Sequence, residues 1–181
     1  MNEKEKKKIS KFLSLVLRHA PETIGLELDE HGWSSTAELM TKSKSVLGEI
    51  NIEMINEVVH TNDKQRFALN EDSSKIRANQ GHSLKTVDLA LEAKTPPSIL
   101  YHGTASKNIE SIKANGIDKR QRQHVHLSAD LETATKVGAR HGKPVILRID
   151  TVAMSQEGCL FYLSENQVWL TDFIDSKYIK I

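Results

Sequence analysis

Two consecutive prolines, Pro96-Pro97, divide the 181-residue chain into two parts with different hydrophobic patterns. Proline fixes φ and removes an N–H donor, so a tandem pair interrupts both helices and strands. Apolar residues before the pair recur at helical spacing, whereas short β-prone runs predominate after it. We predict an α+β protein with an amino-terminal domain at 1–93, a linker at 94–98 and a carboxyl-terminal domain at 99–181.

The amino-terminal part has the order of elements found in winged-helix modules. Apolar residues within 9–17 follow the period of an amphipathic helix, which Ala20-Pro21 ends. Ser35 and Glu38 have the spacing of a capping box and predict a second helix, and the apolar positions of 52–59 predict a third. A hairpin follows, with strands expected around 64–69 and 76–78. Such modules commonly bind nucleic acid, although a fold alone does not establish a function.

The carboxyl-terminal part combines short strands with two short helices. Asn115-Gly116 closes the first of these helices, and Asp130 and Glu132 lie at the positive end of the second. This pattern predicts a β-rich domain with the helices inserted early. The expected helices lie at 108–114 and 131–140, and the expected strands at 99–102, 125–128, 144–149, 161–162, 168–170 and 178–181.

Composition excludes several classes of protein. A single cysteine, Cys159, rules out an intramolecular disulfide and a cysteine-cluster zinc site. No apolar run approaches the roughly 20 residues of a membrane span, and the amino terminus lacks a signal-peptide core. The net charge of +1 conceals a basic stretch at 4–8 and an acidic one at 22–30. We expect a soluble, cytoplasmic protein without an obligate protein partner.

Three basic residues of the first part are candidates for binding a polyanion. Arg18 and His19 fall in the last turn of the first predicted helix, and Arg66 lies opposite the strand face that Phe67 and Leu69 share. Each also has an ordinary explanation, because cations at a helix carboxyl end contribute about 0.3–1 kcal/mol and a strand arginine is usually solvated. Neither signal is specific by itself.

A tract at 122–128 places basic side chains along a predicted strand. His124 and His126 project from the same face, and Arg122 extends it with a planar fork that matches a phosphate. The histidine spacing also suits a metal, but no cysteine, and no acidic residue closer than Asp130, accompanies it. We therefore expect a ligand-facing pair and no metal, with an exposed basic strand as the alternative.

The run Tyr101-His102-Gly103-Thr104 ends a predicted strand in a glycine, which lets a ligand approach the backbone. The Thr104 hydroxyl can bond a ligand or cap the next helix, and a plain strand-to-helix turn is the alternative. Neither a G-x-G-x-x-G nor a G-x-x-x-x-G-K-[ST] sequence occurs. A nucleotide would therefore be held differently from the way Rossmann and P-loop proteins hold it.

Taken together, seven tracts resemble the NAD-dependent RNA 2′-phosphotransferases, the tRNA 2′-phosphotransferase family. They occur in order over nearly the whole chain, which makes the resemblance far more specific than any single motif. The tracts lie at 15–21, 29–33, 65–67, 76–83, 100–104, 122–128 and 164–171.

The resemblance implies a winged-helix RNA lobe, an ADP-ribosyltransferase lobe and catalysis in the cleft between them. It also implies two chemical steps with NAD as co-substrate. The RNA 2′-phosphate, of the tRNA splice-junction type, attacks the anomeric carbon of the nicotinamide ribose and expels nicotinamide, giving a 2′-phospho-ADP-ribosylated RNA. The ribose 2″-hydroxyl then attacks that phosphate, releasing 2′-hydroxyl RNA and ADP-ribose 1″,2″-cyclic phosphate.

The family's catalytic residues carry over to Arg18, His19, Arg66 and Arg122. A phosphate that is first a nucleophile and then an electrophile requires dense positive charge held in place, which three guanidiniums and an imidazole supply. His19 can in addition move a proton. By the same resemblance, the NAD-binding residues are His102, Gly103, Thr104, Gly116, Ile117, His126 and Ser128.

Val168 stands where ADP-ribosyltransferases that modify proteins typically carry a glutamate, with Glu165 as the other candidate for that position. A valine suits a pathway in which the phosphate itself is the nucleophile. Two other functions are compatible with the same NAD site: an ADP-ribosyltransferase that caps terminal phosphates of RNA or DNA, and a nucleic-acid-binding protein that senses NAD without turnover. The presence of all four catalytic residue types favours the phosphotransferase.

Overall fold

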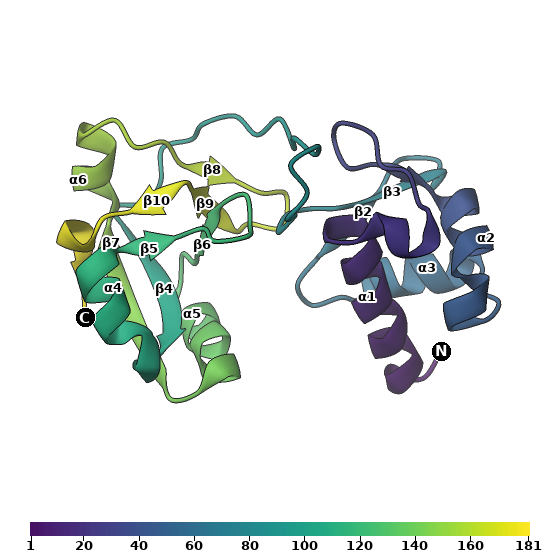
Figure 1. Cartoon of the computed structure of the whole chain (residues 1–181), viewed down its shortest axis with the longest axis horizontal. Coiled ribbons are helices and arrows are strands. Elements are labelled where there is room, and N and C mark those ends of the chain that lie inside the picture. Colours follow the sequence, from purple (N-terminus) through teal and green to yellow (C-terminus); the bar gives the residue numbers. More distant parts are fainter. The chain divides into compact units, whose positions relative to one another are not determined.

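The computed structural model describes residues 1–181 and divides into two compact units, Met1–Ala90 and Leu91–Ile181 (Figure 1). We call them the first and second units. The division falls ahead of the predicted linker at 94–98, which belongs to the second unit. There the Lys94 N–H donates to the Phe161 carbonyl at 2.8 Å.

The first unit contains three helices and a three-stranded antiparallel sheet of order β1-β3-β2. The helices are α1 (Glu3–Arg18), α2 (Thr36–Leu47) and α3 (Ile52–His60), with a 3-10 turn η1 (Pro21–Ile24), and the strands are β1 (Ser34–Ser35), β2 (Phe67–Leu69) and β3 (Lys75–Ala78). The predicted helices and hairpin are confirmed. Strand β1 is too short to leave a pattern in the sequence, and the winged-helix classification stays a prediction.

Helix α1 forms because its cap and its apolar face agree. The Glu5 N–H donates to the Asn2 side chain, and the Asn2 N–H donates to the Glu5 carboxylate, which completes a capping box. The buried face consists of Ile9, Phe12, Leu13, Val16 and Leu17. Burying each such side chain contributes about 1.5–3 kcal/mol. The carboxyl end of α1, where Arg18 lies, is therefore anchored to the core of the first unit.

The second unit combines three small antiparallel sheets with three α-helices. The sheets have the orders β11-β7-β4, β6-β9-β8 and β10-β5. The strands are β4 (Ile99–Ala105), β5 (Ile117–Asp118), β6 (Val125–Leu127), β7 (Pro144–Asp150), β8 (Tyr162–Leu163), β9 (Trp169–Thr171), β10 (Phe173–Ile174) and β11 (Ile179–Lys180). The helices are α4 (Ile109–Asn115), α5 (Leu131–Gly138) and α6 (Thr151–Gln156), with 3-10 turns η2 (Ser106–Asn108), η3 (Ala139–His141) and η4 (Ser176–Tyr178).

These elements confirm a mixed α+β protein, whereas the ADP-ribosyltransferase-like classification of the second unit stays a prediction. Helix α6 and strands β5 and β10 were not predicted. Helix α6 has only six residues and begins at Asp150, whose side chain accepts a hydrogen bond from the Ala153 N–H. Strands β5 and β10 have two residues each, so neither could show an alternating pattern.

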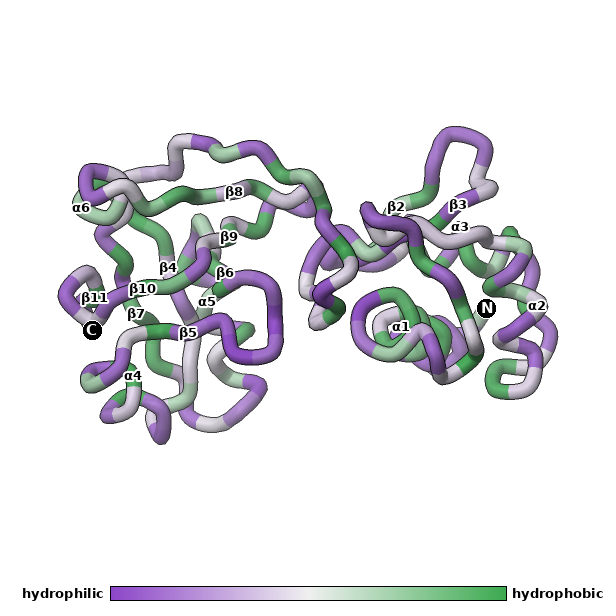
Figure 2. The backbone as a smooth tube through the Cα atoms, turned by 45° about the horizontal axis from the view of Figure 1, so that its top comes forward, coloured by the Kyte–Doolittle hydropathy of each residue, from purple (hydrophilic) through white to green (hydrophobic).

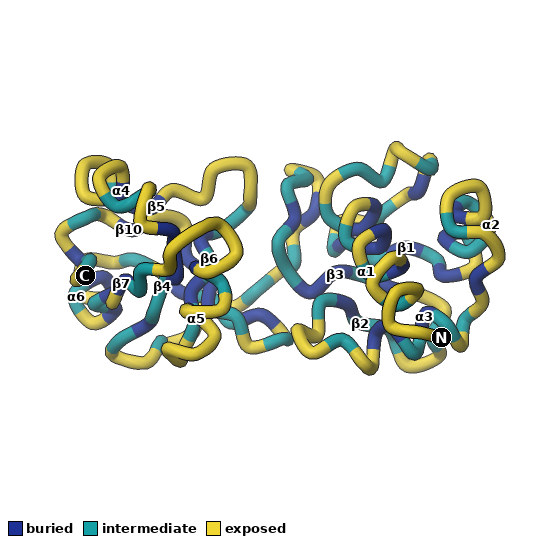
Figure 3. Tube along the Cα trace, turned by 90° about the horizontal axis from the view of Figure 1, so that it is seen from below, coloured by how far each residue is buried: buried dark blue, intermediate teal, exposed yellow.

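The hydropathy and the solvent exposure of the residues differ between the core and the surface of each unit. Figure 2 shows that the residues of the loop between β5 and β6, which contains Arg122, are mostly hydrophilic. Figure 3 shows exposed residues along α1 beside its buried ones. No helix of the protein has both the length and the apolar character needed to cross a membrane.

Candidate active site

Arg18, His19 and Arg66 lie together in the first unit. Arg18 ends α1, His19 is the cap residue of that helix, and Arg66 immediately precedes β2. The Arg18 Nη2 donates to the Arg66 carbonyl at 3.4 Å, and the guanidinium lies 5.8 Å from the centre of the Phe67 ring. The Arg66 Nη1 donates to the Asn62 side-chain oxygen at 3.4 Å. Folding thus gathers three predicted catalytic residues that are up to 48 positions apart.

Ser83 holds the His19 ring. Its Oγ lies 3.0 Å from the His19 Nδ1, and its N–H donates to the Arg18 carbonyl at 3.0 Å. These contacts tie the loop after β3 to the end of α1. Because Ser83 contacts Nδ1, the direction of this hydrogen bond determines whether Nε2 carries the proton or accepts one.

His82 is a buried histidine beside this cluster. It is 0% exposed, and neither of its ring nitrogens has a hydrogen-bond partner. Burial, and to a smaller extent the charges of Arg18, His19 and Arg77, together lower the pKa of His82 to about 4. His82 is therefore neutral near pH 7, and it adds no charge to a region that is already rich in cations.

Arg77 is another cation of this region, and the sequence reasoning did not assign it to the site. Strand β3 carries it, and its guanidinium lies 4.6 Å from the centre of the Trp33 ring. Arg77 and Trp33 belong to two of the seven tracts, at 76–83 and 29–33. Their contact depends on the folding of distant segments, which spacing along the chain could not show.

The second group of predicted residues lies where β4 meets the end of β6. Tyr101 and Ser128 exchange two backbone hydrogen bonds of 2.8 Å each. The His102 Nδ1 lies 3.0 Å from the His126 carbonyl oxygen, and since a carbonyl only accepts, Nδ1 carries the proton. Burial lowers the pKa of His102, while that hydrogen bond opposes the shift. The ring is therefore neutral near pH 7, and Nε2 can accept a hydrogen bond.

Arg122 and His126 are in contact. The Arg122 Nη1 lies 3.2 Å from the His126 Nδ1, and since a guanidinium only donates, Nδ1 is the acceptor. The shared strand face predicted for this tract differs from the structure, because β6 begins at Val125 and Arg122 lies in the preceding loop. His124 also precedes β6, and its ring centre lies 5.5 Å from that of Tyr162. The position of Arg122 is therefore set by a loop and not by the register of a strand.

Gly103 and Thr104 have packing roles in the second unit. A Cβ at Gly103 would lie 1.7 Å from the Ala134 carbonyl oxygen of α5, so the helix packs here only against glycine. The Thr104 hydroxyl accepts a hydrogen bond from the Asn108 side chain at 3.1 Å and is buried. These contacts are sufficient to explain both residue types, and a role in binding NAD stays a prediction.

Gly116 and Ile117 also have structural reasons for their positions. Gly116 ends α4 with a φ of 74°, and a Cβ there would lie 2.2 Å from the Ile174 carbonyl oxygen. Ile117 is buried and pairs with Ile174 across β5 and β10. Packing and strand pairing are sufficient to explain both residue types, and their role in binding NAD stays a prediction.

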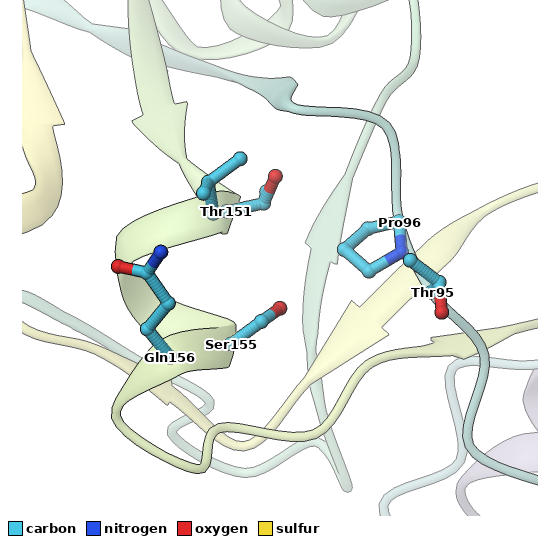
Figure 4. Close-up of a pocket in the computed structure, with 6 residues that line it drawn as sticks. Thr95, Pro96, Thr151, Ser155 and Gln156 are labelled. Atoms are coloured by element: carbon cyan, nitrogen blue, oxygen red, sulfur yellow. The ribbon is translucent and has the colours of Figure 1, made fainter.

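A shallow pocket elsewhere in the second unit lies between the proline segment and α6 (Figure 4). Its volume is about 310 Å³. It is lined by Thr95, Pro96, Thr151, Val152, Ser155 and Gln156. None of these is a cation or a predicted site residue, so we assign the pocket no part in phosphate chemistry.

Comparison with known proteins decides the family. Residues 4–173 match the family described as RNA 2′-phosphotransferase, Tpt1 / KptA family. The chain belongs to this family. The resemblance inferred from the seven tracts is thereby confirmed, and both units contribute to the match.

Relatives similar over nearly their whole length carry the description "Probable RNA 2′-phosphotransferase". One from Fusobacterium nucleatum is 57% identical, covering 96% of this chain and 97% of the relative. One from Flavobacterium johnsoniae is 55% identical, covering 99% and 98% respectively. A third, from Hahella chejuensis, is 53% identical, covering 99% and 96%.

The geometry limits what can bind an anion in the first unit. Arg18 and His19 lie at the carboxyl end of α1, which is the negative end of the helix dipole. An anion there must be bound by side chains, because the helix backbone presents carbonyl groups and not N–H groups. The guanidiniums of Arg18 and Arg66 match the geometry of phosphate oxygens.

Proposed function

We propose that the protein removes an internal 2′-phosphate from RNA, of the tRNA splice-junction type, by transferring it to NAD. The products are 2′-hydroxyl RNA, nicotinamide and ADP-ribose 1″,2″-cyclic phosphate. The observation that carries the proposal is the family match over residues 4–173, since the members of this family are described as RNA 2′-phosphotransferases. The use of NAD and the covalent intermediate rest on the resemblance of the seven tracts to NAD-dependent members.

In the first step, an oxygen of the RNA 2′-phosphate attacks the anomeric carbon of the nicotinamide ribose. The bond from that carbon to the nicotinamide nitrogen breaks, and nicotinamide leaves as a neutral molecule. Arg18 and Arg66 orient the phosphate through charge-assisted hydrogen bonds. No acidic side chain is needed to activate the acceptor, because the phosphate is already an anion.

In the second step, the ribose 2″-hydroxyl attacks phosphorus and the bond from phosphorus to the RNA 2′-oxygen breaks. The proton of the 2″-hydroxyl must move away, and a proton must reach the departing 2′-oxygen. We assign His19, whose Nδ1 contacts Ser83, either the transfer of these protons or the positioning of the phosphate. Arg18, Arg66 and Arg122 stabilise the charge that builds up on the phosphate oxygens.

The second unit offers groups that suit the neutral parts of NAD. His102 is neutral with its proton on Nδ1, so Nε2 can accept a hydrogen bond from a ribose hydroxyl. Ser128 and His126 lie on the segment that pairs with β4 at Tyr101. These observations support the assignment of NAD binding to His102, His126 and Ser128. The resemblance adds Gly103, Thr104, Gly116 and Ile117 as further candidates.

The test is to incubate the protein with NAD and a short RNA that carries one internal 2′-phosphate, and to identify all products by mass. Loss of the phosphate group from the RNA, together with release of nicotinamide and ADP-ribose 1″,2″-cyclic phosphate, supports the proposal. A stable NAD-dependent gain of mass on the RNA would instead support the capping enzyme. The absence of any change with NAD present would support the non-catalytic NAD sensor.

A further inference from the structure

Helix α1 carries a row of exposed lysines that leads to Arg18. Lys4, Lys7, Lys8 and Lys11 are all exposed. Successive residues of a helix are rotated by about 100°, so these four lysines and Arg18 fall within an arc of about 100°. We call Lys4, Lys7, Lys8 and Lys11 the lysine track.

The track lies on the side of α1 opposite the core. The residues buried by the helix, Ile9, Phe12, Leu13, Val16 and Leu17, are centred about 160° from it by the same geometry. Figure 3 shows this division as exposed and buried residues alternating along α1. The lysines therefore face solvent along the first half of the helix.

No lysine of the track has a carboxylate partner, which distinguishes them from the other helical lysines. Lys6 of the same helix pairs with Glu57 at 3.0 Å and with Glu3 at 3.2 Å. The lysines of the other helices, Lys42, Lys44, Lys113 and Lys136, each pair with a glutamate. The four track lysines thus form the one run of helical positive charge that the protein does not neutralise itself.

Folding does not explain these lysines. Cations near a helix amino terminus oppose the helix dipole, at a cost of about 0.3–1 kcal/mol within the first turn, where Lys4 lies. Lys4 and Lys8, and Lys7 and Lys11, are like-charged pairs at i,i+4, which destabilise a helix slightly. Residues that break a local rule of stability without a compensating contact mark functional surfaces.

We propose that the lysine track binds backbone phosphates of the RNA strand on one side of the nucleotide that carries the 2′-phosphate. This proposal rests on the proposed function, which places the 2′-phosphate at Arg18, about two helical turns beyond Lys11 on the same side of α1. From Lys4 to Arg18 the helix rises about 21 Å, the length of about six stacked nucleotides at 3.4 Å each. Lysine suits this task, because a mobile point charge binds phosphates without reading sequence.

An anionic membrane is the other polyanion that such a row could meet. A helix that lies on a membrane places large apolar side chains beside its lysines. The apolar face of α1 is buried in the core, and Leu15, at 41% exposure, is the one large apolar side chain on the lysine side. The geometry therefore favours RNA.

The test compares two triple variants with the same change of charge. Lys7→Gln, Lys8→Gln and Lys11→Gln remove most of the track, and Lys44→Gln, Lys113→Gln and Lys180→Gln remove three exposed lysines of α2, α4 and β11. The probes are 12-nucleotide RNAs with the 2′-phosphate near either end, the same RNAs without it, and a 2′-phosphorylated dinucleotide. Binding is measured against NaCl concentration, and turnover is measured with NAD.

At low salt, the track variant should bind one of the two 12-nucleotide RNAs at least about tenfold more weakly than the wild type. The slope of the logarithm of the binding constant against the logarithm of the NaCl concentration should fall in magnitude by about 2, because each lost phosphate contact contributes about 0.7. Turnover of the dinucleotide by the track variant should be unchanged, and the control variant should match the wild type throughout. The proposal would be overturned if both variants lost the same affinity for RNA, or if the salt slope of the track variant were unchanged. It would also be overturned if the track variant turned over the dinucleotide as poorly as it turned over the longer RNAs. A variant that loses binding to phosphatidylserine vesicles while keeping its affinity for RNA would overturn it as well.

The outcome is separable from that of the proposed function. RNA without a 2′-phosphate tests the track alone, since it has backbone phosphates but no substrate group. If the wild type binds this RNA through the track but removes no 2′-phosphate from the other probes, the track stands and the proposed function fails. If it removes the 2′-phosphate and the track variant binds normally, the proposed function stands and the track fails.

Discussion

The candidate residues of the first unit gather positive charge, whereas in the second unit a backbone contact holds a neutral histidine, His102. In the first unit, Arg18 contacts the Arg66 carbonyl, and nearby cations help to hold the pKa of His82 at about 4. In the second unit, the neutral His102 donates to a backbone carbonyl, and Arg122 is in contact with His126. The difference supports our proposed division of labour, in which Arg18, His19 and Arg66 of the first unit act on the phosphate together with Arg122, and His102 of the second unit binds a ribose hydroxyl of NAD.

The largest expected effect comes from removing the first unit altogether. A fragment of residues 91–181 should bind NAD but should not remove 2′-phosphate from RNA at any detectable rate. It should start at Leu91, because the Lys94 N–H bonds the Phe161 carbonyl within the second unit. Calorimetry with NAD and mass analysis of RNA test this, and Trp169 fluorescence checks that the fragment is folded. Full turnover of RNA by the fragment would contradict the proposed roles of the two units.

Arg66→Ala and Arg122→Ala test whether cations of both units act on the same phosphate. Each should lower the overall rate by about 10²–10³-fold, the usual loss when one group that stabilises transition-state charge is removed. The ADP-ribosylated RNA intermediate should accumulate, since activation of the phosphate as an electrophile suffers more than cleavage of NAD. Rapid-quench samples resolved by mass would reveal it. Arg140→Ala, at an exposed position of η3, is the control, and no intermediate in either variant would contradict this assignment.

Ser83→Ala should have a smaller effect, confined to the orientation of His19. We expect kcat to fall about tenfold, which corresponds to about 1.4 kcal/mol, while the KM for NAD stays unchanged. The reason is that the His19 ring loses its partner at Nδ1. Ser83→Thr keeps the hydroxyl and should restore the rate. A uniform loss in both variants would indicate that Ser83 serves only to fold the loop.

His82→Asn should change stability and leave the rate near pH 7 within about twofold. The folded-state pKa of about 4 lies below the ordinary value of 6.5, so the unfolded chain binds more protons between these values and stability falls as the pH decreases through this range. From pH 7 to pH 5 the wild type should lose about 2 kcal/mol through His82, and the variant should not.

The chain makes this measurement direct, because it has one tryptophan in each unit, Trp33 and Trp169. In a Trp169→Phe background, urea unfolding followed by fluorescence reports the first unit alone. Equal pH dependence with and without His82 would show that other groups cause the loss of stability.

Segments with a clear apolar pattern were predictable, whereas several very short strands were not. The helix predicted from the apolar residues within 9–17 and the hairpin strands predicted at 64–69 and 76–78 correspond to α1, β2 and β3, because an amphipathic period and a turn-bounded hairpin pattern are local signals. Strands β1, β5 and β10 have two residues each, and they exist because partners from distant segments supply their hydrogen bonds. For the same reason, the predicted linker at 94–98 belongs to the second unit.

The site divides in the same way. The order of the motifs alone indicated the family and the candidate catalytic residues Arg18, His19, Arg66 and Arg122. This is possible because the chemistry of a family depends on which residue types occur and on their order along the chain. The contact of Ser83 with His19, and that of Arg77 with Trp33, could not be predicted from spacing.

By itself, the sequence determined the α+β class, the amphipathic α1 and the membership of the RNA 2′-phosphotransferase family, because these depend on local periodicity and on ordered motifs. Only the tertiary structure decided that Arg18 reaches the Arg66 carbonyl, that His82 is neutral, and that Gly103 is required by the packing of α5. Burial, a shifted pKa and a steric limit each arise from groups far apart in the chain. They exist only after the chain has folded.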